Sequence, residues 1–253
     1  MKPYLSHEHP IRFAHRGSRV LWPENTMVAF QGAVDLGYRY IETDVHVTRD
    51  GKVVIFHDND LDRLSDGVGT FVDHDWADVR HLDAAFGFKP EEGLPLRGTG
   101  VTMPLFEEAV TAFPEQMWNV DLKQPGIAER FAAEVHRLGI EDRVLIGSFH
   151  DRRIRAFRHE APGVATSAGP VEVARSLARR PRRQVGADAY QVPERATGVR
   201  LVTSRFVGRA HNAAKHVHVW TVNDPIDMRR LLDLGVDGII TDRPDLLNEV
   251  LGK

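Results

Sequence analysis

Short apolar runs alternate with longer amphipathic stretches along the chain. Nine runs have the length and the β-branched or aromatic content typical of strands, and they lie at 11–15, 40–45, 53–57, 118–123, 143–149, 163–168, 188–192, 217–222 and 238–241. Most of the stretches between them place apolar residues at helical spacing, and Gly37, Gly139 and Gly235 follow such stretches as helix-ending glycines do. This alternation predicts parallel βα units.

The run at 53–57 differs from the other eight. Only a short segment containing Arg49-Asp50-Gly51 separates it from the run at 40–45, and so short a connection allows antiparallel pairing only. Eight parallel strands then remain, and eight βα units in 253 residues match a (β/α)8 TIM barrel. We therefore expect an α/β fold with one domain over 1–253 and a small insertion subdomain after the second strand, at about 47–103.

Carboxylates cluster where the predicted strands end. Glu42 and Asp44 fall on one face of the second strand because side chains alternate with period two, and Asp121 lies near the end of the run at 118–123. The carboxyl ends of barrel strands meet at one rim, so these acids would repel one another there unless a cation joined them. With oxygen ligands and no cysteine, a hard divalent ion is expected, Mg²⁺ or Ca²⁺. For any single acid, a salt bridge or a helix cap is the alternative.

Two histidines also fall at strand ends. His15 ends the first strand and His57 ends the hairpin arm, so both are candidates for proton transfer at the same rim. His46 shares a face with Glu42 and Asp44, where it is either a further ligand or a supporting or exposed residue. Most of the 13 histidines are expected to be solvated, and these include His9 and His159.

Arg16 and Lys123 are cations next to these groups. They could bind a phosphate group, Arg16 through two parallel hydrogen bonds and Lys123 as a point charge, or they could only neutralise the acids. Cations, carboxylates with a metal ion, and two histidines together suit the hydrolysis of a phosphate ester.

Composition and charge bear on whether the protein binds nucleic acid or inserts into a membrane. The net charge is −3 with the two signs interspersed, which gives no sign of a nucleic-acid partner. No apolar run approaches the ~18 residues of a membrane span, and the first residues contain no apolar core of a signal peptide. We expect a cytoplasmic protein without stable membrane insertion; the oligomeric state stays open.

Six motifs in order carry a resemblance to a known family. They are AHRG, PENTMVAF, IETDVHVTRDGKVVIFHD, NVDLK, VWTVND and GVDGIITDRPD, spread from about residue 11 to 245. Together they resemble the glycerophosphodiester phosphodiesterase family. The resemblance implies a (β/α)8 barrel that hydrolyses small glycerophosphodiesters, such as glycerophosphocholine or glycerophosphoethanolamine, to sn-glycerol 3-phosphate and an alcohol. It also implies a role in lipid and glycerol metabolism and one divalent cation, Mg²⁺ or Ca²⁺, with Mn²⁺ as a further candidate.

The resemblance assigns roles to individual residues. It implies His15 and His57 as the acid–base pair, and Arg16 and Lys123 as phosphate-binding residues. The implied metal ligands are Glu42, Asp44 and Asp121.

Three points of the resemblance are less direct. The family usually has Glu where this chain has the shorter Asp121. Trp220 corresponds to an aromatic residue near the glycerol pocket, with packing between strand and helix as the alternative. Glu24 and Asn25 are expected to cap the first helix and to order the first rim loop.

Three other functions would require different features of the sequence. A lysophospholipase D acting on lysophospholipids would need an apolar approach to the rim. The aromatic residues of the insertion could provide that approach or could form the insertion's own small core; they are Phe71, Trp76, Phe86 and Phe88. A catalytically silent phosphodiester-binding barrel would lack one of the catalytic histidines or acids. A metal-dependent aldolase or isomerase would typically need a Schiff-base lysine or a sugar-phosphate glycine loop, and neither is clear here.

Overall fold

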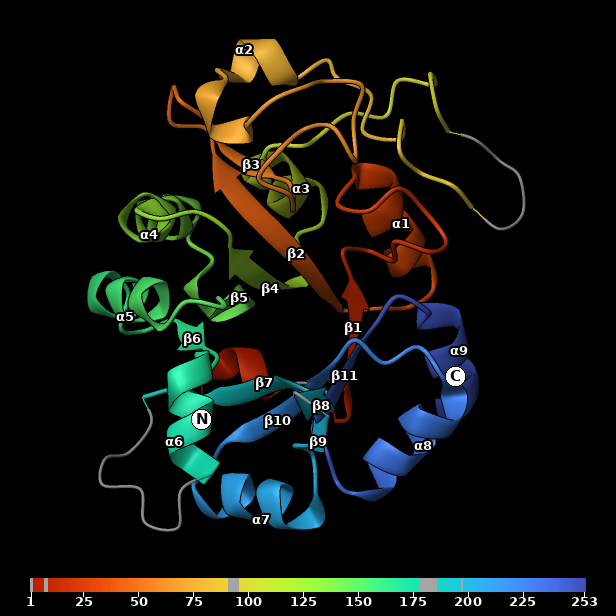
Figure 1. The fold of residues 1–253 in the computed structure, drawn as a ribbon, viewed down its shortest axis with the longest axis vertical. Coiled ribbons are helices and arrows are strands. Elements are labelled where there is room, and N and C mark those ends of the chain that lie inside the picture. The colour runs from red at the N-terminus through yellow and green to blue at the C-terminus, as the bar shows by residue number, and fades with distance from the viewer. Residues whose placement is uncertain (1, 7–8, 91–95, 178–185, 197) are drawn as a thin grey trace.

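A parallel β-barrel forms the centre of the molecule. The computed structural model describes residues 2–6, 9–90, 96–177, 186–196 and 198–253. Within these ranges eight parallel strands follow one another around the barrel in the order β6-β5-β4-β2-β1-β11-β10-β7 (Figure 1). Their bounds are β1 Ile11–His15, β2 Tyr40–Val47, β4 Met117–Leu122, β5 Val144–Gly147, β6 Ala165–Thr166, β7 Ala189–Pro193, β10 His216–Trp220 and β11 Gly238–Thr241. A parallel bridge between Ser167 and Ala189 brings β6 against β7. The predicted TIM barrel is confirmed.

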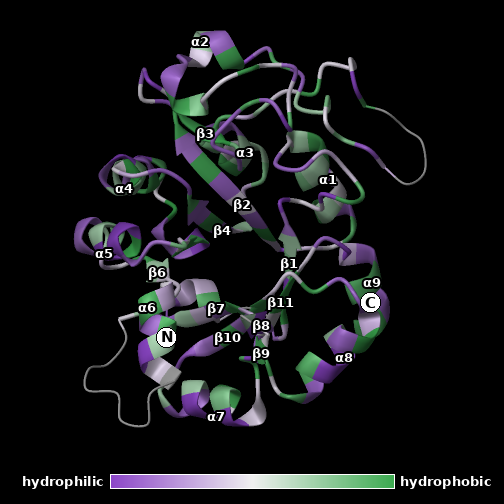
Figure 2. Ribbon diagram, viewed as in Figure 1, coloured by the Kyte–Doolittle hydropathy of each residue, from purple (hydrophilic) through white to green (hydrophobic). Residues whose placement is uncertain are grey.

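Helices follow the strands and cover the outside of the barrel (Figure 1). They are α1 Met27–Asp35, α3 Phe106–Ala112, α4 Ile127–Leu138, α5 Asp151–Glu160, α6 Pro170–Leu177, α7 Ser204–Asn212, α8 Pro225–Asp233 and α9 Pro244–Leu251. Figure 2 shows hydrophobic and hydrophilic residues mixed along these helices, as expected when one face of each helix is buried. On α4, Phe131 and Val135 are fully buried in a cluster with Val120 of β4. The helix ends at Gly139, whose φ of 64° is left-handed, as the sequence predicts.

The sixth strand is shorter than predicted. The run at 163–168 contributes only Ala165–Thr166 as a strand, because Pro162-Gly163 precede it in a turn and Pro170 already begins α6. Other predicted strand bounds agree with the structure to within two residues. The apolar run therefore predicted the position of this strand correctly, although only two of its residues form the strand.

The segment between β2 and α3 has a hydrophobic cluster of its own. β3 (Val53–Ile55) pairs antiparallel with β2, as the hairpin signal predicts. The 3₁₀ turn Phe71–Asp73 and helix α2 (Trp76–Val79) follow. Phe71 is fully buried in the cluster and Trp76 packs against it, whereas Phe86 is exposed beneath the guanidinium of Arg97. For Phe71 and Trp76 the structure thus favours a core role over a substrate approach.

The smaller elements complete the description. They are the 3₁₀ turns Pro3–Leu5 and Glu141–Arg143 and the two-residue strands β8 (Arg195–Ala196) and β9 (Val199–Arg200), which pair antiparallel. Of the helices that the structure describes, none has the length and apolar content to cross a bilayer.

Candidate active site

A cavity of about 570 Å³ opens at the carboxyl ends of the barrel strands. Eight side chains that the sequence singled out for chemistry line this cavity, and His46 does not: the eight are His15, Arg16, Glu42, Asp44, His57, Asp121, Lys123 and Trp220. They lie in or directly after four strands and the hairpin, and the first and last of them, His15 and Trp220, are 205 positions apart in the chain. The predicted convergence on one rim is therefore what the structure shows.

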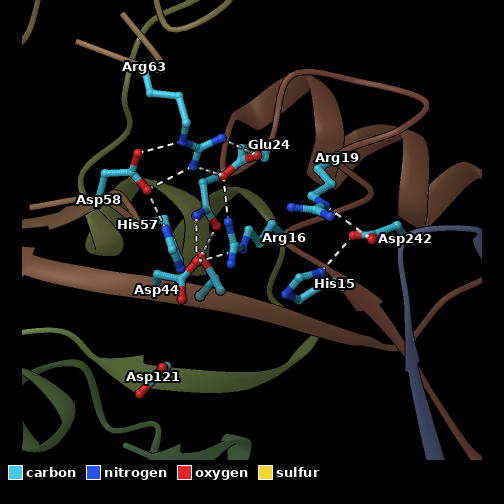
Figure 3. Close-up of polar contacts among 12 residues, drawn as sticks. His15, Arg16, Arg19, Glu24, Asp44, His57, Asp58, Arg63, Asp121 and Asp242 are labelled. Carbon is cyan, nitrogen blue, oxygen red and sulfur yellow. Dashed lines mark hydrogen bonds and ion pairs between the residues drawn. The ribbon is translucent and has the colours of Figure 1, made fainter. Parts of the chain in front are cut away.

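Strand register explains the convergence. His15 of β1 pairs with Glu42 of β2, and Asp44 of β2 pairs with Asp121 of β4. The backbone N–H of Phe56 donates to the carbonyl of Asp44 at 3.0 Å, which brings His57 to the same face as the acids. Figure 3 shows His57 beside Asp44, with His15 on the other side of Arg16.

Asp44 is the most enclosed acid. It is buried between Lys123, whose Nζ lies 2.9 Å from Oδ1, and Arg16, whose Nε lies 3.1 Å from Oδ2. Asn25 adds a hydrogen bond from Nδ2 to Oδ2 at 2.8 Å. Burial alone would raise the pKa of Asp44, but the charges of Lys123 and Arg16 lower it far below its ordinary value. Asp44 is an anion throughout the physiological pH range.

Glu42 and Asp121 are less well compensated. Burial and the neighbouring Asp44 raise the pKa of Glu42 to about 7. Burial likewise raises the pKa of Asp121, although Lys123 donates to its Oδ2 at 2.7 Å. Its Oδ1 is buried and has no hydrogen-bond partner among the described residues. This edge of the cavity therefore has an excess of negative charge.

Glu42, Asp44 and Asp121 have the donor chemistry of a site for a hard divalent cation. A cation would bind the unpartnered Oδ1 of Asp121 and relieve the repulsion that raises the pKa of Glu42. In the described part of the chain, however, oxygens of the three groups do not all lie within 4.8 Å of one another. The ammonium of Lys123 lies between Asp44 and Asp121. The three acids therefore suit such an ion by their chemistry and charge, but their oxygens are not gathered around a single point.

His15 is held by a buried carboxylate. Its Nδ1 lies 2.6 Å from Oδ1 of Asp242, and its Nε2 lies 3.8 Å from Oε2 of Glu42. Asp242 is itself fixed by Nε of Arg19 at 3.1 Å and Nδ2 of Asn223 at 2.9 Å. Burial alone would lower the pKa of His15, but the carboxylates of Glu42 and Asp242 raise it above its ordinary value. The protonated imidazolium is thereby favoured.

His57 has a similar arrangement. Its Nδ1 lies 2.5 Å from Oδ1 of Asp58, and Arg63 donates to both oxygens of Asp58, at 2.6 and 2.8 Å (Figure 3). In both histidines the Nδ1 atom is engaged by a carboxylate, so Nε2 is the atom available for proton transfer.

His46 has a supporting role. It is fully buried, and its ring lies within hydrogen-bond distance of Oε1 of Gln124 (3.2 Å) and of the carbonyl of His57 (3.3 Å). It packs against Phe71. His46 therefore positions the backbone that carries His57.

The expectation for Glu24 and Asn25 is corrected by the structure. The cap of α1 is Thr26, whose Oγ1 accepts from the N–H of Ala29 at 3.2 Å. Asn25 has a φ of 59°, which turns its side chain towards Asp44 and away from the helix. Glu24 instead accepts from Nη1 of Arg16 at 2.6 Å. The ordering of the rim loop does hold, because the N–H of Asn25 donates to the carbonyl of Arg16.

Several site residues were not identified from the sequence. Asp242, Asp58 and Arg63 orient the histidines directly or through a neighbour, as described above. Asp242 follows the last residue of β11, so the rule that selected Asp121 could have selected it as well. Arg63 gives no such signal, because it lies in an irregular loop of the insertion.

Part of the cavity wall is apolar. Trp220 lies at its edge, with its ring 5.3 Å from that of Phe149 in an edge-on arrangement. Val173 of α6, Val192 of β7 and Leu201 continue this wall. The cavity is thus lined by both charged and apolar side chains, and these apolar side chains do not come from the insertion.

Comparisons with known proteins agree with this geometry. A model of the glycerophosphoryl diester phosphodiesterase family matches residues 15–246. A probable glycerophosphodiester phosphodiesterase 2 of Mycobacterium tuberculosis is 42% identical, covering 98% of this chain and 93% of its own. A glycerophosphodiester phosphodiesterase of Bacillus altitudinis is 34% identical, covering 92% and 94%. An Oleispira antarctica phosphodiesterase solved with its product sn-glycerol-3-phosphate has a similar fold, with a TM-score of 0.80, 22% identity and 97% and 98% coverage.

Proposed function

Because the chain belongs to the glycerophosphoryl diester phosphodiesterase family, we propose that it hydrolyses glycerophosphodiesters to sn-glycerol 3-phosphate and an alcohol. Small diesters such as glycerophosphocholine and glycerophosphoethanolamine are the proposed substrates. The observation that carries the proposal is the pair of imidazoles, each oriented by a carboxylate, at the edge of a cavity that contains both acids and cations. The product held by the Oleispira antarctica protein is consistent with the same product here.

His15 acts as the general acid in this proposal. Glu42 and Asp242 favour its protonated form, His15 lines the cavity, and Asp242 engages only its Nδ1, so Nε2 can donate a proton to the departing alcohol. Asp242 holds the ring in a fixed orientation, and Arg19 and Asn223 hold Asp242. The alcohol then leaves as a neutral molecule rather than as an alkoxide.

His57 acts as the general base. Its Nε2 accepts the proton of the attacking hydroxyl, which belongs either to water or to the neighbouring hydroxyl of the glycerol group by way of a cyclic phosphate. Asp58 stabilises the imidazolium that forms, and Arg63 keeps Asp58 in place. His57 thus removes one proton from the attacking hydroxyl, and His15 gives one proton to the leaving alcohol.

The cations and acids position the phosphate group. Members of the family generally use a divalent metal ion. Glu42, Asp44 and Asp121 would hold it, as Mg²⁺ or Ca²⁺ with Mn²⁺ as a further candidate. When bound, such an ion withdraws charge from the phosphate oxygens and lowers the pKa of a coordinated hydroxyl. Arg16 and Lys123, now paired with the acids, are then free to bind phosphate oxygens.

A substrate panel tests the proposal. Glycerophosphocholine, glycerophosphoethanolamine and lysophosphatidylcholine are incubated with protein stripped by EDTA and then supplied with Mg²⁺, Ca²⁺ or Mn²⁺. Release of sn-glycerol 3-phosphate is measured by an enzyme-coupled assay. Ion-dependent release from the small diesters is expected. Undiminished activity in EDTA would contradict the role given to the three acids.

A lysophospholipase D activity is the second candidate. The apolar wall of Phe149, Val173, Leu201 and Trp220 gives an acyl chain a surface to lie on. Phe149 follows β5, Val173 belongs to α6, Leu201 follows β9 and Trp220 ends β10, so this surface does not come from the aromatic residues of the insertion. Cleavage of lysophosphatidylcholine with kcat/KM above that of glycerophosphocholine would make this the main activity.

A further inference from the structure

A second group of metal-binding side chains lies at the opposite end of the barrel. His9 precedes β1, His216 is the first residue of β10, and Asp237 immediately precedes β11. These three strands are neighbours, so their amino-terminal ends bring the three residues together. One ligand atom from each lies within 4.8 Å of the other two, and no other such trio occurs in the described part of the chain.

His216 is the buried member of the trio. Only 7% of its surface is exposed, and its Nδ1 has no hydrogen-bond partner within the described ranges. Its ring lies 5.2 Å from the ring of His9. Burial lowers the pKa of His216, which favours the neutral imidazole, the form that binds a metal ion. A buried imidazole nitrogen without a partner has a cost of desolvation that a bound cation would offset.

Asp237 is held in place for such a role. Its Oδ2 accepts from the backbone N–H of Val217 at 2.7 Å and lies 2.8 Å from Nε2 of His211. Within the described residues, the carboxylate of Asp237 makes these two contacts through Oδ2, which leaves Oδ1 for an ion. His211 is then a supporting residue that orients a ligand.

We propose that His9, His216 and Asp237 bind one transition-metal dication of the Zn²⁺ class. Two imidazoles and one carboxylate suit Zn²⁺, Co²⁺ or Ni²⁺, whereas Mg²⁺ and Ca²⁺ prefer oxygen ligands. Ligand atoms about 2 Å from a tetrahedral ion lie roughly 3.4 Å apart, and the atoms of the trio lie within 4.8 Å of one another. His9 is the exposed member and can adjust its position to the ion. The ion would tie the segment before β1 to β10 and β11.

This site is separate from the active site. The two clusters occupy opposite ends of the same parallel strands, as β10 shows by having His216 at its start and Trp220, which lines the active-site cavity, at its end. An ion of the Zn²⁺ class at one end of the barrel and Mg²⁺ or Ca²⁺ at the other can therefore be distinguished by competition between the two kinds of ion.

Zn²⁺ binding to the untagged full chain tests the proposal. Isothermal titration calorimetry is run with excess Mg²⁺ on the wild type and on Glu42→Gln, which removes a ligand of the other site. One equivalent of Zn²⁺ is expected to bind both proteins. His9→Gln should weaken this binding at least tenfold, because even loss of a supporting residue costs roughly 10- to 100-fold. His159→Gln is the matched control, since His159 is an exposed histidine on α5.

A thermal readout accompanies the titration. Zn²⁺ should raise the Tm of the wild type and of His159→Gln but not that of His9→Gln, whose Tm without metal should equal that of the wild type. Equal Zn²⁺ affinity in His9→Gln and the wild type would overturn the proposal. The proposal would also be overturned if the wild type bound no equivalent of Zn²⁺ in the presence of excess Mg²⁺.

Discussion

Replacing Glu42 by glutamine should stabilise the metal-free protein at alkaline pH while it removes activity. Glu42 is 7% exposed, and its Oε2 accepts from the backbone N–H of Arg16 at 3.1 Å. Glutamine is nearly isosteric and its Oε1 can keep that hydrogen bond. The substitution therefore removes a buried charge and little else.

The size of the effect follows from the pKa of Glu42. Burial and Asp44 raise this pKa from its ordinary 4.5 to about 7. The folded protein therefore binds the proton more tightly than the unfolded chain, and the free energy of unfolding falls as the pH rises through this window. At about 1.4 kcal/mol for each pH unit, the loss above pH 7 is about 3 kcal/mol. Glutamine does not titrate, so the variant avoids this loss.

The assay is urea unfolding in EDTA at about pH 5 and about pH 8. The stability gain of Glu42→Gln over the wild type should be small at the lower pH and close to its full value at the higher pH. Glu115→Gln, an exposed glutamate after α3, should show no such pH-dependent gain. Added Mg²⁺ should stabilise the wild type more than Glu42→Gln, because a ligand that binds the folded form stabilises it.

Two results would refute this reasoning. Equal stability of the wild type and Glu42→Gln at the higher pH would show that Glu42 is not destabilised in the folded protein. Lower stability of the variant there would show that attraction to His15 and the nearby cations outweighs burial and repulsion.

Three further predictions concern catalysis and specificity. His57→Ala should lower kcat for glycerophosphocholine by roughly 10²- to 10⁴-fold, the usual contribution of a positioned acid or base, and near-normal turnover in a folded variant would remove His57 from the mechanism. Asp242→Asn should lower kcat by roughly 10- to 100-fold, the value of a hydrogen bond between charged groups, as steady-state kinetics would measure. It should also move the alkaline limb of the pH–rate profile to lower pH, because Asp242 helps to raise the pKa of His15; an unmoved limb would contradict the assignment. Leu201→Asp should reduce kcat/KM for lysophosphatidylcholine more than for glycerophosphocholine; equal losses on the two substrates would show that an acyl chain does not lie on the apolar wall.

The barrel and its charged rim were predictable because both follow from short-range pattern. Alternating strand and helix periodicity gives the parallel units, and the period of two places Glu42 and Asp44 on one face. Neighbouring parallel strands then bring Asp121 opposite Asp44 without any further information. The family resemblance, carried by motifs in order along the chain, was confirmed by the matching family model.

The partners of these residues were harder to predict because they depend on loop conformation. The sequence predicts that Asn25 caps the first helix, but its positive φ turns its side chain to Asp44, and no periodic pattern encodes that angle. The contact from Arg63 to Asp58 joins two positions of an irregular loop. His9 was expected to be solvated, which its exposure agrees with, yet its proximity to His216 and Asp237 appears only in three dimensions. The insertion bounds, the individual catalytic roles and the cytoplasmic location stay predictions.

Leaving-group dependence in His15→Ala tests the paired-histidine mechanism most directly. With glycerophosphocholine, whose alkoxide needs a proton to leave, His15→Ala and His57→Ala should both be strongly impaired. With the p-nitrophenyl ester of sn-glycerol 3-phosphate, whose phenolate leaves unprotonated, His15→Ala should recover most of the wild-type rate and His57→Ala should not. If His15→Ala is equally slow on both esters, or if His57→Ala alone recovers, His15 is not the acid that the geometry assigns.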